Sequence, residues 1–225
     1  MRKNMKNGIS FFTGLIWVFA WFGFMLLYTF LDVLLWKKVF PGWQKYFNII
    51  TIALCTISFL FLLTQKNTFH IEILKNISIK GILLSVGCSV LFYFILDKGL
   101  DIILANIFPS SEASYQEALI SLSKTPIITL IQVCLLAPVL EEILMRGFLL
   151  NGWSAAYGKP IALLISSLIF ALLHFNMVQT LSAFFCGIVL GLLYLHTESL
   201  FCCILAHAGY NFISYITTIV PLYQK

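Results

Sequence analysis

Two carboxylates and one guanidinium occur in a six-residue segment inside a strongly apolar stretch. They are Glu141, Glu142 and Arg146, and the surrounding run from about 126 to 150 has no other charge. On insertion scales a charge at the bilayer centre costs about 2.5–3.5 kcal/mol, so such residues usually face a protein interior and serve a function. Glu142 and Arg146 are four residues apart and can pair along one helix face. Glu141 points about 100° away from Glu142 and is free to face neighbouring helices.

The second half of the chain carries further polar groups with one-turn spacing. His207 and Asn211 are four residues apart in one apolar run, and Phe170 precedes His174 by four residues in another. Each run therefore presents a polar group on one helix face, as a site at the centre of a bundle requires. Pro138 lacks an N–H, so we expect a kink just before the two acids.

These residue types support a limited set of reactions. A carboxylate withdrawn from water can act as a general base near neutral pH, and a neutral imidazole can share that proton transfer. The amide of Asn211 and a histidine N–H can donate hydrogen bonds to an oxyanion. Together they fit a water molecule, activated by a carboxylate, that attacks an amide carbonyl. The sequence has no HExxH, GxSxG or intramembrane Gly-Asp motif. A Glu–Arg pair or a lone histidine is often structural, so the functional interpretation depends on the groups occurring together.

In this combination the chain resembles the CPBP family of intramembrane endopeptidases (CAAX protease and bacteriocin-processing, or Abi, family). The family's three motifs are EExxxR, FxxxH and HxxxN. They stand here in order as Glu141-Glu142-Ile-Leu-Met-Arg146, Phe170-Ala-Leu-Leu-His174 and His207-Ala-Gly-Tyr-Asn211. The resemblance covers about 125–214, the expected catalytic core. Met145 stands where the family often has an aromatic residue.

The resemblance implies a role for each matching residue. It implies that Glu141 and His174 activate water, and that His207 and Asn211 stabilise the oxyanion or complete a polar cage. Glu142 and Arg146 would support Glu141, with Glu142 able to share its catalytic role, and Phe170 would be a supporting residue.

The resemblance leaves the need for a metal open. Family members are commonly described as metalloproteases, but a metal-free glutamate mechanism is an equally serious alternative. Glu141, His174 and His207 would make a chemically reasonable zinc site with an open position for water. We favour direct activation of water without a metal, and no other cofactor is implied.

The composition requires lipid as the solvent for much of the chain. Of 225 residues, 60% are hydrophobic and 10% are charged, with a mean hydropathy of +0.97. A soluble domain carries about 25% charge. The net charge of +5 fits positive flanks and contact with lipid headgroups better than binding to nucleic acid. The six cysteines lie in apolar runs without ligand spacing and are predicted to be small buried hydrophobes.

The apolar runs predict an all-α bundle of about seven transmembrane helices in a single domain, 1–225. The expected spans are about 9–36, 47–64, 81–107, 126–150, 161–175, 177–195 and 200–220. Six or eight spans are alternatives because the fifth is short and the first and third are long. Arg2, Lys3 and Lys6 precede a first span that we expect to be retained. Amphipathic surface helices are expected over 65–80 and 109–124. Gly187 and Gly191 permit close helix packing. Asp97, Lys98 and Asp101 are interpreted as the polar end of the third span or as a shift of the chain into the interface.

We interpret the chain as an intramembrane endopeptidase that cleaves a membrane-associated peptide or protein, with the bacterial plasma membrane as the expected location. One alternative is a non-catalytic protein, for bacteriocin immunity or peptide sensing, that uses the same polar cavity. A proton-coupled transporter is disfavoured, because no polar path extends through the first three spans and no repeat is present. A prenylated C-terminal peptide, a bacteriocin leader and a signalling-peptide precursor all fit as substrates.

Overall fold

The computed structural model describes residues 8–224, and the three N-terminal basic residues Arg2, Lys3 and Lys6 lie outside this range. The chain is 86% helical, with no strand in the described part. Six helices are long and apolar enough to cross a membrane. They are Phe11–Val39, Gln44–Lys66, Ile79–Ile107, Pro126–Tyr157, Met177–Thr197 and Leu200–Tyr223. The prediction of a polytopic helical membrane protein is confirmed.

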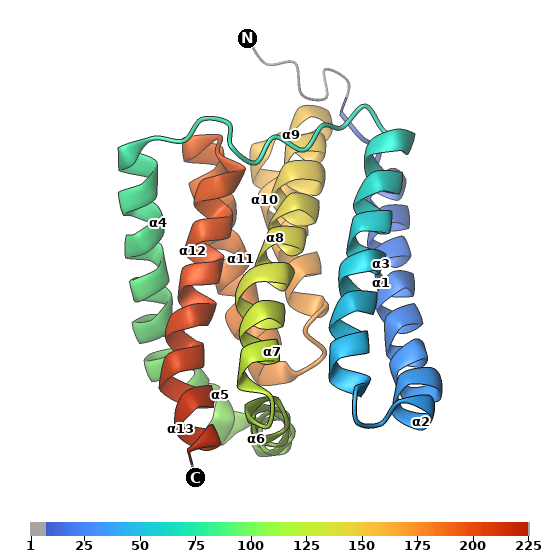
Figure 1. Cartoon of the computed structure of the whole chain (residues 1–225). Helices are drawn as coiled ribbons and strands as arrows, with labels where there is room; N and C mark the ends of the chain where they lie inside the picture. The colour runs from blue at the N-terminus through green and yellow to red at the C-terminus, as the bar shows by residue number, and fades with distance from the viewer. Residues whose placement is uncertain (1–7, 225) are drawn as a thin grey trace.

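The seventh crossing is the short helix α10, Lys159–Leu172. Its 14 residues span about 21 Å, less than the hydrocarbon thickness of about 30 Å. Helix α1 (Phe11–Leu31) begins at the upper end of the bundle in Figure 1, and α13 (Val220–Tyr223) ends at the lower end. A chain that begins at one end and finishes at the other crosses an odd number of times. The short α10 therefore completes seven crossings.

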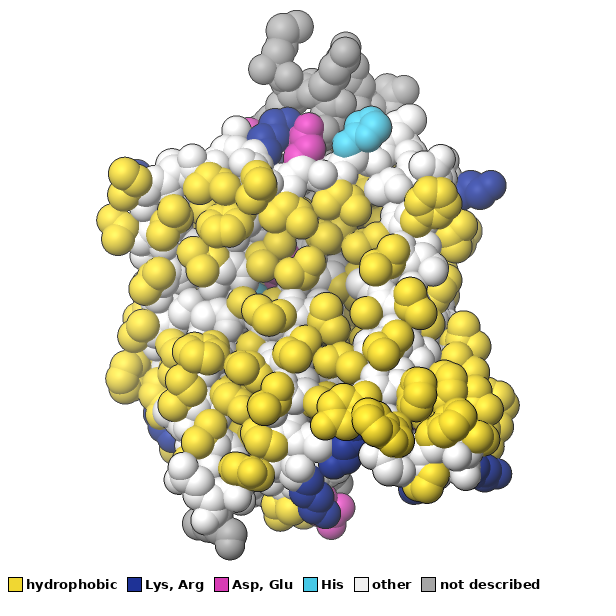
Figure 2. Space-filling model, in the orientation of Figure 1, with side chains coloured by type: hydrophobic (Ala, Val, Ile, Leu, Met, Phe, Trp, Pro, Cys, Tyr) yellow, Lys and Arg dark blue, Asp and Glu magenta, His cyan; other side chains and the backbone are white. Residues whose placement is uncertain are grey.

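The outside of the bundle is apolar between two polar ends. Figure 2 shows hydrophobic side chains across the middle of the molecule, with lysines, arginines and acids near its upper and lower limits. Large side chains such as Phe12, Ile79 and Ile127 are strongly exposed. Water would make this surface very unfavourable, whereas lipid solvates it, which explains the composition.

One of the two predicted surface helices forms. Helix α6 (Pro109–Ser123) lies at the lower end of the bundle (Figure 1), as expected. The prediction of a surface helix over 65–80 is wrong. Helix α3 (Gln44–Lys66) continues to Lys66, and residues 67–78 form an irregular connection, here called the strap, that leads to α4 (Ile79–Phe92).

The apolar residues of the strap that pack against the main core have a period of two rather than the period of a helix. They are Phe69, Ile71 and Ile73, whereas Leu74 and Ile77 are exposed. Phe69 is 3% exposed, and its ring lies 5.5 Å from that of Phe148. An alternating pattern favours extended chain over helix. The burial of alternate residues therefore outweighs the spacing of the lysines, which had suggested a helix on the membrane surface.

The central helix of the bundle is the span Pro126–Tyr157. It comprises α7 (Pro126–Ile131), α8 (Ala137–Glu142) and α9 (Asn151–Tyr157), joined by wider π-type turns over 132–136 and 143–150. Every residue from Glu142 to Leu150 is buried. The helix passes Pro138 without a break, because the π-type turn just before the proline accommodates its missing N–H.

Small residues bring the neighbouring helices close together. A Cβ on Gly187 of α11 (Met177–Thr197) would lie 3.0 Å from Cβ of Ser167 in α10, and one on Gly191 would overlap Leu163. This confirms the close packing predicted from the glycine spacing. Between α4 and α12 (Leu200–Ser214), the Ser89 hydroxyl donates to the Ala206 carbonyl at 2.9 Å.

Candidate active site

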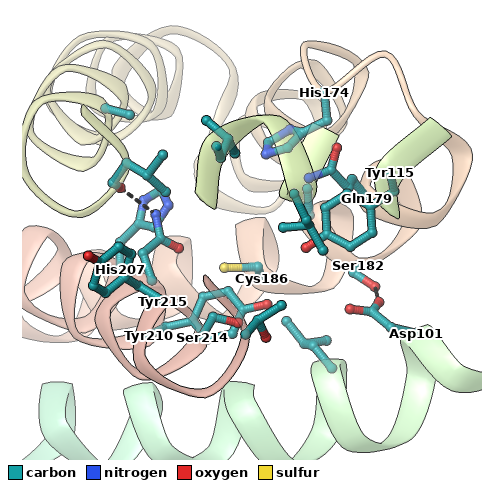
Figure 3. Close-up of a pocket in the computed structure, with 18 of the residues that line it drawn as sticks. Asp101, Tyr115, His174, Gln179, Ser182, Cys186, His207, Tyr210, Ser214 and Tyr215 are labelled. Atoms are coloured by element: carbon teal, nitrogen blue, oxygen red, sulfur yellow. Dashed lines mark hydrogen bonds between the residues drawn. The ribbon is translucent and has the colours of Figure 1, made fainter. Parts of the chain in front are cut away.

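A single cavity of about 310 Å³ collects the polar residues of three spans. Glu141 from α8, His174 from the turn after α10, and His207 and Asn211 from α12 all line it, together with Phe170. Figure 3 shows His174 and His207 on opposite sides of this cavity, with Cys186 between them. The fold therefore brings these five residues together around one cavity, as their spacing predicted.

The two neighbouring glutamates have different environments. The Glu141 side chain retains 28% of its exposure and faces the cavity, whereas that of Glu142 has none. Adjacent residues on a helix diverge by about 100°, which separates the two carboxylates into one cavity group and one interior group.

The buried Glu142 carboxylate is shared by two partners. The Arg146 guanidinium donates to its Oε1 at 2.9 Å, as the four-residue spacing predicted, and Nδ1 of His207 lies 2.9 Å from the same oxygen. Its Oε2 is buried without a hydrogen-bond partner. Glu142 therefore connects the central helix to α12 from behind the cavity wall.

Arg146 is held by more than this ion pair. Its second terminal nitrogen donates to the Gly187 carbonyl at 3.1 Å, and the guanidinium lies over the Phe170 ring at 4.7 Å from the centroid. The Phe170 ring also makes T-shaped contacts with the imidazoles of His174 and His207, whose centroids lie 5.1 and 5.8 Å from its own. Phe170 therefore acts as a packing surface between the cation and both imidazoles.

His207 is the residue whose environment was missed from sequence. We expected Glu141 to work with His174, but the structure also places Nε2 of His207 3.9 Å from Oε2 of Glu141. Because an ionised carboxylate only accepts hydrogen bonds, Nδ1 of His207 carries the proton directed at Glu142. The other ring nitrogen of His207 is left facing Glu141.

His174 is positioned by a short connection inside the bundle. Its Nδ1 lies 3.0 Å from the Phe170 carbonyl, which only accepts, so in the neutral ring Nε2 has the free lone pair. Asn176 caps α11 by accepting from the Val178 and Gln179 amides and donates to the Ser111 carbonyl of α6 at 2.8 Å. Irregular backbone at membrane depth persists only where protein or a wet cavity satisfies it.

A second set of polar contacts was also missed, in which Asp101 lines the cavity and Asp97 lies behind the lining residues Tyr210 and Ser214. Asp101 accepts from the Ser182 hydroxyl, and Asp97 accepts from the hydroxyls of Tyr210 (2.6 Å) and Ser214. These two acids were interpreted as the polar end of the third span. Their four-residue spacing, which places both on one helix face toward α11 and α12, was the signal that could have identified them.

The donor set does not fit a preformed zinc site. Within the described part of the chain, no three His, Cys, Asp or Glu side chains are grouped so that they could hold a metal ion. His174 and His207 stand on opposite sides of the cavity (Figure 3). Each has its Nδ1 engaged by a protein acceptor, which leaves its Nε2 as the nitrogen that could bind a metal.

A family model agrees with this segment of the chain. The model for Rce1-like type II CAAX prenyl endopeptidases matches residues 123–213, which run from before α7 almost to the end of α12 and include every residue of the three motifs. No curated protein and no solved structure matches the chain. The match confirms that the segment which builds this cavity, less than half of the chain, resembles the CPBP family of intramembrane endopeptidases.

Proposed function

We propose that the protein is an intramembrane endopeptidase that hydrolyses a peptide bond with a water molecule activated by Glu141 and His174. The observation that carries the proposal is the single cavity that contains Glu141, His174, His207 and Asn211. It is large enough for a short peptide segment and a water molecule, and its acid and imidazoles come from separate helices.

In the proposed reaction, Glu141 takes a proton from water while the water oxygen attacks the scissile carbonyl carbon. His174 presents a free Nε2 lone pair to the cavity and shares this proton transfer. The proton then passes to the leaving nitrogen as the carbon–nitrogen bond breaks, which yields a carboxylate and an amine.

The developing oxyanion requires donors, and His207 and Asn211 are placed to supply them. His207 can donate from Nε2 only when both ring nitrogens carry protons, because Nδ1 is directed at Glu142. In that form the charges of Glu141, Glu142, Arg146 and His207 sum to zero. A buried cluster without net charge is the least costly one to hold in the membrane.

We further propose that the substrate is a membrane-associated peptide or protein. A type II CAAX prenyl endopeptidase is what the family model describes, so a prenylated C-terminal peptide is the first probe to use. Bacteriocin leaders and signalling-peptide precursors are the next candidates, because the first half of the chain has no match that selects among them.

The test uses the full chain in liposomes with an internally quenched farnesylated CAAX-type peptide and with a quenched apolar peptide of transmembrane length. We expect cleavage to be abolished in each of the variants Glu141→Ala, His174→Ala and His207→Ala. The matched controls are Glu117→Ala and His196→Ala, which change an exposed glutamate and an exposed histidine and should keep cleavage. Full turnover by well-folded Glu141→Ala protein would refute the mechanism. Binding of peptide by all variants, without cleavage by the wild type, would favour the non-catalytic alternative.

A metal requirement is tested separately. Purified protein is analysed for bound zinc and then assayed after chelation. We expect cleavage to persist in metal-free protein. Activity that disappears on chelation and returns with zinc would show that a metal completes the site.

A further inference from the structure

Pro138 lies on the helix that carries both glutamates, and its missing N–H has a specific partner on another helix. In an α-helix the carbonyl of Val133 would accept from the amide of Ala137, and in a π-type turn it would accept from residue 138. The Ala137 amide donates instead to the Gln132 carbonyl, five residues back, and Pro138 has no N–H to donate. The Val133 carbonyl is therefore left without a donor from its own helix.

The donor comes from the cavity residue Asn211. Its Nδ2 donates to the Val133 carbonyl at 2.8 Å, across the interface between α12 and the π-type turn. The bond is partly buried, and a carbonyl withdrawn from water without a partner is costly, so this bond fixes the amide of Asn211 as well as satisfying the backbone. The second N–H and the carbonyl oxygen of Asn211 remain for the cavity.

We infer that Pro138 is a positioning residue that acts through Asn211. Because Pro138 donates no hydrogen bond to the Val133 carbonyl, that carbonyl is available to Asn211. The bond between them fixes the amide plane of Asn211, the proposed oxyanion donor on a different helix. The inference rests on the proposed function only for its effect on catalysis, because the hydrogen bond itself can be measured in protein that cleaves nothing.

The first measurement is spectroscopic. Full-length protein with ¹⁵N-labelled asparagine is compared as wild type, Pro138→Ala and Pro126→Ala, and Asn211→Ala assigns the Asn211 side-chain signal. Alanine at 138 supplies a backbone donor that competes for the carbonyls of this turn. We expect hydrogen exchange of the Asn211 amide to become about tenfold faster in Pro138→Ala.

Two controls make the result specific. Pro126 occupies the first turn of α7, where a missing N–H costs nothing, so Pro126→Ala should leave the Asn211 signal unchanged. The Asn176 side-chain amide, which donates to the Ser111 carbonyl, is an internal reference that should not respond. An Asn211 amide with wild-type exchange in Pro138→Ala would overturn the inference, as would equal loosening of Asn176.

The second measurement is kinetic. With a cleaved peptide probe, Pro138→Ala should lower kcat about fivefold at unchanged KM, because Asn211 would act on the transition state and not on substrate binding. A change in KM alone would contradict the positioning role. Absence of cleavage in the wild type counts against the proposed peptidase function and leaves the spectroscopic result as the test of Pro138.

Discussion

The Nδ1 atom of His207 lies 2.9 Å from Oε1 of Glu142, while its Nε2 lies 3.9 Å from Oε2 of Glu141. One imidazole thus faces two adjacent carboxylates of another helix, one inside the protein and one in the cavity. The buried carboxylate fixes the orientation of the ring, and the partly exposed one faces the cavity in which we propose that a substrate carbonyl stands. We infer that the neighbouring glutamates divide into one structural and one chemical group.

Conservative replacement of each glutamate should separate these roles. Glu142→Gln removes the charge that balances Arg146 in a dry interior, and breaking such a pair costs about 3 kcal/mol. Glu141→Gln should leave stability almost unchanged and abolish cleavage, because its carboxylate is partly exposed in the cavity. Thermal unfolding in detergent and peptide cleavage are measured on both variants. Equal destabilisation by the two changes would contradict the division.

Arg146→Lys is expected to be disruptive although the charge is kept. A guanidinium bonds Glu142 and the Gly187 carbonyl at the same time while stacking over Phe170, and an ammonium cannot match that planar geometry. We expect a loss of about 2 kcal/mol in the free energy of unfolding. The exchange Lys75→Arg at an exposed pair with Glu72 is the control and should have little effect. Wild-type stability in Arg146→Lys would show that charge alone suffices.

The contacts within the three motifs were predictable because helical geometry is local. Four-residue spacing placed Glu142 against Arg146 and His207 beside Asn211 on one face, and burial of charge required those faces to meet inside the bundle. The glycine pair in α11 similarly predicted its close contact with α10. What a single helix dictates through its own periodicity was therefore available from the residues themselves.

The rest depended on contacts between helices. Nothing in the spacing revealed that His207 would approach Glu142, since the rotation of α12 against α8 sets that contact. The partners of Asp97 and Asp101, which are Ser182, Tyr210 and Ser214, could not be predicted because they are separated from these acids by more than 80 residues in sequence. A surface helix was predicted over 65–80 because apolar residues there alternate with Lys66, Lys75 and Lys80, whereas Phe69 is buried in the strap.

Stability should fall above pH 10 in a manner that depends on Tyr115. Burial, followed by the charges of Asp97, Asp101 and Glu112, raises the pKa of this phenol well above its ordinary value. Between the unfolded and the folded pKa, the native protein keeps a proton that the unfolded chain releases, so rising pH favours unfolding. Tyr115→Phe should make the free energy of unfolding less dependent on pH from 9 to 11. Identical slopes in both proteins would contradict this.

Asn176 should be needed both for the start of α11 and for the attachment of α6. Its side-chain oxygen caps two amides, and its nitrogen donates to the Ser111 carbonyl. Asn176→Ala removes all three bonds and should cost about 1–2 kcal/mol.

Asn176→Asp is the variant that separates the two functions, because a carboxylate still caps the helix but has no N–H for Ser111. We expect Asn176→Asp to retain most of the stability lost in Asn176→Ala, while hydrogen exchange in α6 accelerates in both. His174 lies two residues away in the same connection, so cleavage should weaken most in Asn176→Ala. If exchange in α6 is unchanged in both variants, Ser111 is not what ties this helix to the cavity.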